Sequence, residues 1–117
     1  MARNKVVRIG EILDAMEKDF LPKVKGELVK RDSQGAIVGA CAYGQAALHL
    51  GVEPNSLFSA IQTWATDNGV PVLNQVVTLN DSSDITVSAI ARYAKAEIPS
   101  WALNRAIVVE ENPRFNA

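Results

Sequence analysis

The chain has 117 residues, the size of one ordinary domain, and 48% of them are hydrophobic against 21% charged. Its 12 basic and 13 acidic side chains give a net charge of −1, which argues against a dominant attraction to nucleic acid or an anionic membrane. It has no apolar run near the ~20 residues that cross a bilayer, and no secretory signal. The single Cys41 cannot form an internal disulfide. We therefore expect one cytoplasmic domain over residues 1–117, with a polar tail from about residue 110 and no membrane association.

Apolar side chains recur at three- and four-residue spacings in the first part of the chain. They are Ile9, Ile12, Leu13, Met16, Phe20 and Leu21. This pattern predicts an amphipathic helix, which Pro22 and Gly26 would end.

The segment GELVKRDSQGAIVG, residues 26–39, has two short extended pieces around Asp32-Ser33-Gln34-Gly35. Asp at the start and Gly at the end favour a type I turn, so we predict a small hairpin. Because a two-stranded ribbon is marginal alone, the hairpin should lie against helices. Residues 40–51, ACAYGQAALHLG, then predict an alanine-rich helix that stops at Gly51 and packs closely at the centre of the fold.

Residues 53–69, EPNSLFSAIQTWATDNG, predict a third helix. We expect Asn55 or Ser56 to cap it and Asn68-Gly69 to end it. Residues 70–80 fit either a helix or a strand, and we favour the helix because the chain supplies few partners for another strand.

Residues 82–98, SSDITVSAIARYAKAEI, predict a fourth helix that Asp84 or Thr86 caps and Pro99 closes. A last turn over residues 100–111 leads into the polar tail. The expected fold is therefore mainly α, a compact bundle of four to five helices with one small β-hairpin.

Gly39 and Gly44 have the spacing of a phosphate-binding loop, G-x-x-x-x-G-K-[ST]. The positions of the lysine and the hydroxyl residue hold Gln45 and Ala46, so the phosphate and magnesium contacts are missing. We therefore expect no nucleotide or other cofactor, and we interpret the two glycines as positions of close packing.

Cys41, His49 and Asn80 are the residue types of a Cys-His-Asn catalytic set, in which the cysteine is the nucleophile, the histidine is the base and the asparagine orients the histidine. On one helix, however, Cys41 and His49 would lie about 12 Å apart along the axis, whereas a catalytic pair needs about 3 Å. One Cys and one His cannot make a zinc site, and NDSSD lacks the residues of a calcium loop. We expect no metal and no enzyme, with catalysis by Cys41 as the unfavoured alternative.

Residues 85–107 resemble the helix-turn-helix of the lac-repressor type. The matching residues are Thr86, Ile90, Ala91, Tyr93 and Ala94. Lys95 occupies the position where the motif has its turn glycine, and Pro99 lies near the start of the second helix. The motif is therefore degenerate. DNA binding through Arg92, Lys95 and Arg105 remains an alternative.

Three motifs together resemble an uncharacterised family of small helical proteins found in actinobacteria and their phages. They are a D-x-x-G turn, a Cys-Ala-x-Gly helix start, and an Asn-Asp pair before a Thr-capped helix. The matching positions are Asp32, Gly35, Cys41, Ala42, Gly44, Asn80, Asp81 and Thr86. The resemblance covers about residues 9–97, and it implies a fold and a phage or bacterial origin more than an activity.

Asn80 and Asp81 are expected to form an Asx-type turn before the following helix. The alternative places them beside Cys41 and Tyr43 in a small polar pocket, although we expect a filled core there.

The function that we expect is that of a non-enzymatic interaction protein, such as a phage accessory protein that engages a host protein. A protein partner or self-association would use aromatic side chains, since partly exposed aromatic residues anchor interfaces. The candidates are Trp64, Tyr93, Trp101 and Phe115, of which Trp64 is the one we favour as a core residue.

Overall fold

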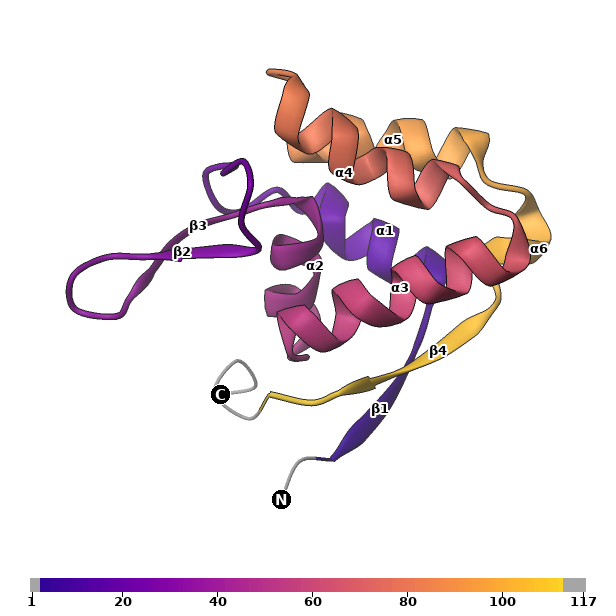
Figure 1. Ribbon diagram of the computed structural model, residues 1–117, viewed down its shortest axis with the longest axis horizontal. Coiled ribbons are helices and arrows are strands. Elements are labelled where there is room, and N and C mark those ends of the chain that lie inside the picture. Colours follow the sequence, from indigo (N-terminus) through magenta and orange to yellow (C-terminus); the bar gives the residue numbers. More distant parts are fainter. Residues whose placement is uncertain (1–2, 113–117) are drawn as a thin grey trace.

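The computed structural model describes residues 3–112, and within them the chain forms six helices and four strands (Figure 1). The helices are α1 (Ile9–Glu17), α2 (Ala42–Leu50), α3 (Pro54–Asn68), α4 (Val72–Ser82), α5 (Val87–Glu97) and α6 (Ser100–Leu103). The strands are β1 (Asn4–Arg8), β2 (Val29–Arg31), β3 (Ile37–Ala40) and β4 (Ala106–Glu110). They form two antiparallel two-stranded sheets, β1 with β4 and β2 with β3. The mainly α class is confirmed, but the described residues hold more helices than the expected four to five and a second sheet.

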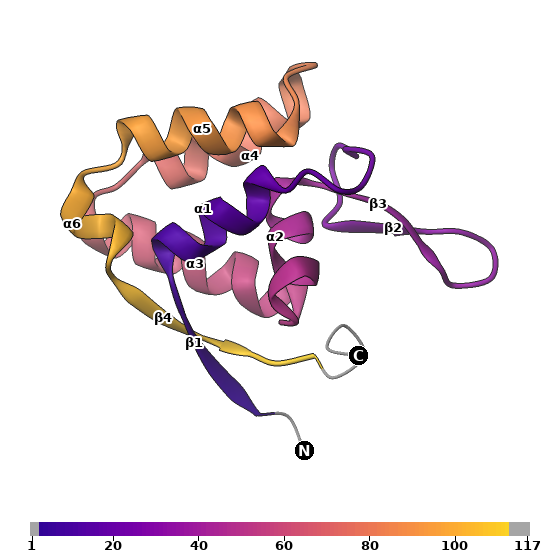
Figure 2. The ribbon, with the colours of Figure 1, turned by 180° about the vertical axis from the view of Figure 1, so that it is seen from behind.

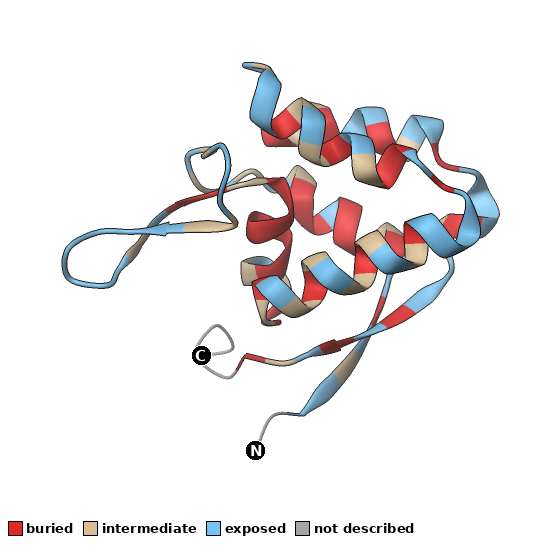
Figure 3. Cartoon of the chain, viewed as in Figure 1, coloured by how far each residue is buried: buried red, intermediate tan, exposed pale blue. Residues whose placement is uncertain are grey.

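Helix α2 lies at the centre, as its small side chains predict. Residues 42–47 are all buried, and the helix ends where Gly51 takes a left-handed backbone with φ 71°. Figure 3 shows the first two-thirds of α2 in the colour of buried residues, and the inward faces of the surrounding helices are coloured alike. A neighbouring backbone can approach this helix closely at Ala42, Gly44, Ala46 and Ala47, whose side chains are no larger than a methyl group.

The two glycines of the G-x-x-x-x-G frame are packing positions, as expected. A Cβ atom on Gly44 would lie 1.9 Å from the carbonyl oxygen of Leu28, at the base of the hairpin. A Cβ atom on Gly39 would lie 2.8 Å from Cγ1 of Val24 and 3.1 Å from the carbonyl oxygen of Pro22. Only glycine leaves room for these backbones.

The β2–β3 hairpin has the predicted turn. The carboxylate of Asp32 accepts the N–H groups of Gln34 and Ala36 at 2.9 and 3.0 Å, and Gly35 has φ 85°. The expectation that the hairpin lies against helices holds only at its base, because residues 31–36 are all exposed and the ribbon projects from the body in both views (Figures 1 and 2). Its base is the anchored part, where the N–H of Cys41 donates to the carbonyl of Leu28 at 3.0 Å.

The first helix is shorter than its apolar pattern predicts. It ends at Glu17, and Asp19 has a left-handed backbone with φ 46° that turns the chain away from the helix axis. Phe20 therefore lies outside the helix and is 50% exposed, although the apolar pattern includes it.

The helix favoured for residues 70–80 is confirmed as α4, and Thr86 caps α5 by accepting the N–H of Ala89 at 3.2 Å. The expected end of α3 at Asn68-Gly69 is confirmed, but the expected N-cap at Asn55 or Ser56 is wrong. Glu53 is its N-cap and Pro54 its first residue, because proline needs no hydrogen-bond partner there. The hydroxyl of Ser56 instead accepts the N–H of Glu110 at 2.9 Å.

The β1–β4 ribbon was not expected, since residues 100–111 were predicted as a turn. It pairs Asn4 with Glu110 and Val6 with Val108, so segments from the two ends of the described chain lie side by side. Val7 and Val109 are buried against the body, whereas Val6 and Val108 face outwards. Alternation of this kind is typical of a strand with one solvated face.

Candidate functional site

A cavity of about 240 Å³ lies between the base of the hairpin, the start of α2 and the second half of α4. Cys41, Tyr43, Asn80 and Asp81, the residues of the predicted polar pocket, all line it. Our expectation of a filled core at this place is therefore wrong. Gly26 and Ala42, which also line the cavity, carry too little side chain to fill the space between the hairpin base and α4.

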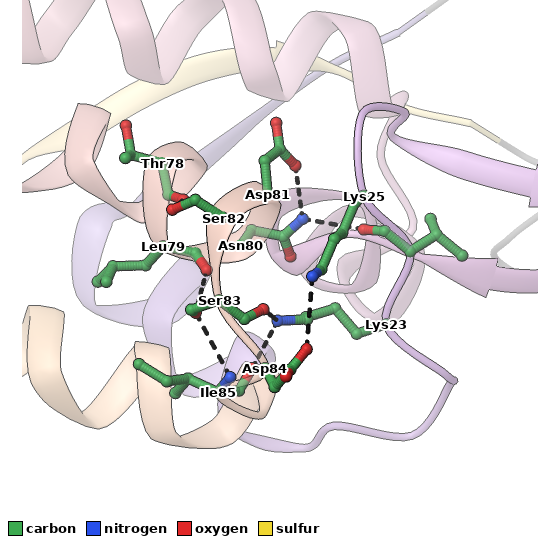
Figure 4. A network of polar contacts seen from close by, with 11 residues as sticks. Lys23, Lys25, Thr78, Leu79, Asn80, Asp81, Ser82, Ser83, Asp84 and Ile85 are labelled. Atoms are coloured by element: carbon green, nitrogen blue, oxygen red, sulfur yellow. Dashed lines mark hydrogen bonds and ion pairs between the residues drawn. The ribbon is translucent and has the colours of Figure 1, made fainter.

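Asn80 joins three separate segments at this cavity. It is 2% exposed, and its Oδ1 accepts the N–H of Ala42, at the start of α2, at 2.9 Å. Its Nδ2 donates to the carbonyl of Val24 at 2.9 Å and to the carboxylate of Asp81 at 3.0 Å (Figure 4). The predicted Asx turn before a helix is wrong, because Asn80 lies inside α4 and its bonds reach distant parts of the chain.

Asp81 lies at the exposed rim of the cavity. Its carboxylate accepts the N–H of Gly26 at 3.0 Å, together with the Asn80 amide. These two hydrogen bonds, and then the positive charges of Lys23 and Lys25, hold the pKa of Asp81 below its usual value, against a small opposing effect of burial. Asp81 is therefore ionised at neutral pH.

The two lysines near Asp81 have other partners. Lys23 Nζ donates to the carbonyls of Ser83 and Ile85, each at 2.7 Å, and so closes the loop between α4 and α5 (Figure 4). Lys25 Nζ lies 3.4 Å from the carboxylate of Asp84. Neither lysine lines the cavity.

Tyr43 forms one wall of the cavity. It is 1% exposed, its hydroxyl donates to the carbonyl of Leu73 at 2.5 Å, and its ring lies 6.1 Å from the ring of Phe58. Burial raises the pKa of Tyr43 far above the usual range. The residue is therefore a neutral, fixed wall with a satisfied hydroxyl.

Cys41 is the N-cap of α2, and its Sγ accepts the N–H of Gly44 at 3.4 Å. Burial raises the pKa of the thiol more than the backbone N–H groups of Gly44 and Tyr43 lower it, and the charge of Asp81 raises it further. The helix continues without a break to Leu50, so His49 lies at its other end, exposed and beside Phe20. As the spacing predicts, no catalytic pair forms from Cys41 and His49.

Gln45 is a buried residue of this region that the sequence analysis did not identify. It is 0% exposed, its Nε2 donates to the carbonyls of Leu21 and Ala40, and its Oε1 accepts the N–H of Leu21. Gln45 thus holds the start of the irregular segment 21–26 at Leu21, while Asn80 holds it at Val24 and Asp81 at Gly26. The one sequence feature that could have identified Gln45 is its long polar side chain among the alanines of α2.

The two tryptophans lie together on another part of the molecule. The ring of Trp64 lies 6.2 Å from that of Trp101, and the guanidinium of Arg105 lies 5.6 Å from the Trp101 ring. Trp101 is 47% exposed, and Trp64 is partly buried beneath it. Trp64 also lines an open groove of about 570 Å³ between α3 and β4, with Val108 on the strand side.

Two further aromatic candidates remain. Tyr93 does not share the buried face of α5, since it is 43% exposed, with its hydroxyl 3.4 Å from Oε1 of Gln75. Phe115 lies outside the described residues.

The residues proposed for DNA binding do not form a free basic face. Lys95 Nζ lies 2.7 Å from the carboxylates of both Asp14 and Glu17 on α1, and Arg105 lies over Trp101, while Arg92 is exposed. Residues 85–107, the basis of the alternative DNA-binding hypothesis, do not form a helix-turn-helix, because α6 has only four residues and the chain continues as β4 from residue 106.

Residues 3–112 contain no group of three His, Cys, Asp or Glu side chains that could hold a metal ion. None of the helices within that range is long and apolar enough to cross a membrane. No protein-family model, curated protein or solved structure matches the chain.

Proposed function

We propose that this chain is a non-enzymatic interaction protein that holds a protein partner on the surface formed by Trp64, Trp101 and Arg105, here called the tryptophan surface. One observation carries the proposal. Trp101 keeps 47% of its surface exposed while it packs on Trp64 and Arg105. Trp and Arg are the residues that most often contribute large binding energies at interfaces, and Trp64 holds the Trp101 ring so that little side-chain entropy is lost on binding.

The surface is larger than the aromatic pair. Trp64 lines the open groove between α3 and β4, and Val108 lines the opposite side of the same groove. Val108 is paired across the ribbon with Val6, and these two valines are 58% and 64% exposed. Exposed or partly exposed apolar side chains thus lie on both sides of a groove that also contains polar residues of α3, and a mixture of apolar and polar surface is typical of interfaces.

The family resemblance is the reason to look for that partner among the proteins of an actinobacterial host, as expected of a phage accessory protein. A reducing cytoplasm suits a chain with one cysteine. Self-association through the same surface is the alternative, and the native mass of the isolated protein separates it from a host partner.

The experiment is affinity purification from a host lysate followed by reconstitution with the purified partner. We expect Trp101→Ala to weaken the reconstituted complex by at least about tenfold, as truncation of a central tryptophan does. Phe20→Ala is the matched control, because Phe20 is a similarly exposed aromatic residue whose ring neighbour is His49. Equal binding by both variants would remove the tryptophan surface from the proposal.

A further inference from the structure

The cavity beside Asn80 has the dimensions of a site for one small group. Its volume of about 240 Å³ exceeds the roughly 150 Å³ of a cavity that holds benzene. Its walls are mainly apolar, from Leu28, Tyr43, Phe58, Val76 and Val77. Walls of this composition fit an aromatic ring or a branched alkyl group.

The charged residues that line the cavity have one sign. Among the described residues that line it, the charged side chains are Asp81 and Glu27, both acidic and both exposed at the rim. Lys23 and Lys25, whose charges act on Asp81 from outside the cavity, are bonded to the carbonyl groups of Ser83 and Ile85 and to Asp84, respectively. The opening is therefore complementary to a cation.

The buried polar groups of the wall are already used, and the remaining neutral polar side chain, Asn55, is exposed at the rim. Asn80 accepts one N–H and donates both of its amide hydrogens, and the hydroxyl of Tyr43 donates to Leu73. The Cys41 thiol carries no charge and accepts the N–H of Gly44. An incoming hydrogen-bond donor would therefore meet the carboxylate groups rather than the buried amide.

We infer that this cavity binds an ammonium group carried on a small apolar body, with the apolar body between Phe58 and Val77 and the ammonium group at Asp81. Two sources share this chemistry, a free small amine and the N-terminal residue of a peptide. The site uses residues other than the tryptophan surface, so it does not depend on the proposed function.

The test is an NMR titration of the intact chain that follows the backbone amides of Gly26, Ala42 and Val77. Phenethylamine, 2-phenylethanol and 3-phenylpropionate present similar apolar bodies with a positive, a neutral and a negative end. We expect phenethylamine to bind at least about tenfold more tightly than the other two, as a charge-assisted hydrogen bond gives. Equal binding of amine and alcohol, or no shift of these amides with any probe, would overturn the inference.

Variants locate the charge that is responsible. Asp81→Asn keeps an oxygen that can accept the Gly26 N–H, and it should abolish the preference for the amine over the alcohol. Asp84→Asn is the matched control, since Asp84 is an exposed acid outside the cavity, and it should leave the preference unchanged. If Asp81→Asn fails to fold, Glu27→Gln takes its place and should reduce the preference. If the variant that folds, Asp81→Asn or Glu27→Gln, keeps the same preference for the amine over the alcohol, the inferred role of the rim carboxylates is overturned.

Peptides separate the two sources. Phe-Gly-Gly with a free N-terminus is compared with its N-acetylated form and with phenethylamine. Tighter binding of the free peptide than of phenethylamine identifies a polypeptide terminus, and tighter binding of phenethylamine identifies a free amine. Binding of the acetylated peptide as tight as that of the free peptide would contradict the inference.

Discussion

The N–H of Ala42 donates to Oδ1 of Asn80 at 2.9 Å, although the two residues are 38 positions apart. Through this bond a buried side chain of α4 caps the start of α2. Cys41 caps the same end of the helix, where its sulfur accepts the N–H of Gly44. The same Asn80 amide also holds Val24 and Asp81. One carboxamide therefore fixes the mutual positions of two helices and an irregular segment, and these form most of the cavity.

Asn80→Ala should lower the free energy of unfolding by about 3 kcal/mol, because it removes three hydrogen bonds and leaves buried backbone groups without partners. Asn74→Ala on the same helix is the control, since Oδ1 of Asn74 is buried without a hydrogen-bond partner within residues 3–112. Its effect should stay below about 1 kcal/mol. Urea denaturation measures both, and equal losses would show that the bridging bonds contribute little.

Gly44→Ala should destabilise the protein by about 3 kcal/mol or more, because the new methyl group meets the Leu28 carbonyl at 1.9 Å and a packed backbone cannot move aside cheaply. Gly10→Ala is the comparison. There the nearest atom is the carbonyl oxygen of Leu103 at 3.1 Å, and alanine adds about 1 kcal/mol of helix propensity. Thermal unfolding of both variants tests the ranking, which a folded Gly44→Ala protein of normal stability would refute.

Cys41 should react slowly with a disulfide reagent in the native protein. Its pKa is raised, so the reactive thiolate is scarce at pH 7 and increases only as the pH rises above the usual thiol range. We expect a native rate at least about tenfold below that of the chain in urea at the same pH. Asp81→Asn should speed the native reaction, because removing the negative charge lowers the pKa. A native thiol that reacts faster than the unfolded one would instead support an enzyme that uses Cys41.

Lys95 should stabilise the contact between α5 and α1 below alkaline pH. Its hydrogen bonds to Asp14 and then Glu17 raise its pKa in the folded protein. The stabilisation is therefore complete below the ordinary lysine pKa of about 10.4 and is lost as the pH rises through the higher folded value. Because these side chains are partly exposed to screening solvent, Lys95→Met should cost no more than about 1 kcal/mol.

Urea denaturation at pH 7 and above pH 11, with and without 1 M NaCl, tests this contact. The difference between Lys95→Met and the parent should shrink at high pH and in salt. Arg92→Met, on the same helix and bonded to the Ser88 hydroxyl at 3.4 Å, should change stability little under all four conditions. A Lys95→Met effect that does not depend on salt would indicate lost packing instead.

The elements that the sequence analysis predicted correctly depend on neighbouring residues. The Asp32 turn, the Thr86 cap and the stop at Gly51 each follow from side chains or glycines within a few positions. The β1–β4 ribbon could not be found in this way, because each strand has only five residues and its partner lies at the other end of the described chain. Short apolar runs do not identify their pairing partners.

The cavity was predictable only in part. Four of its residues were grouped from short motifs, but a filled core was the preferred expectation, since spacing along the chain does not report how far backbones stand apart. Phe58 on α3 and Val77 on α4 are both partly buried and both line the cavity, although they are 19 positions apart in the chain. Gln45 was considered only as a replacement for lysine, and its bonds to Leu21 and Ala40 could not be read from its neighbours.

The pairing of Asn4 with Glu110 has a consequence for how the chain reaches its fold. Almost the whole described chain separates these partners, so the ribbon closes a long loop and its entropy cost favours closure after the intervening helices have packed. During synthesis, Val7 of β1 would therefore stay without its strand partner until β4 has left the ribosome. The same proximity allows a circular permutant, with a short linker joining the two strands and new ends opened in the exposed Ser33–Gln34 turn.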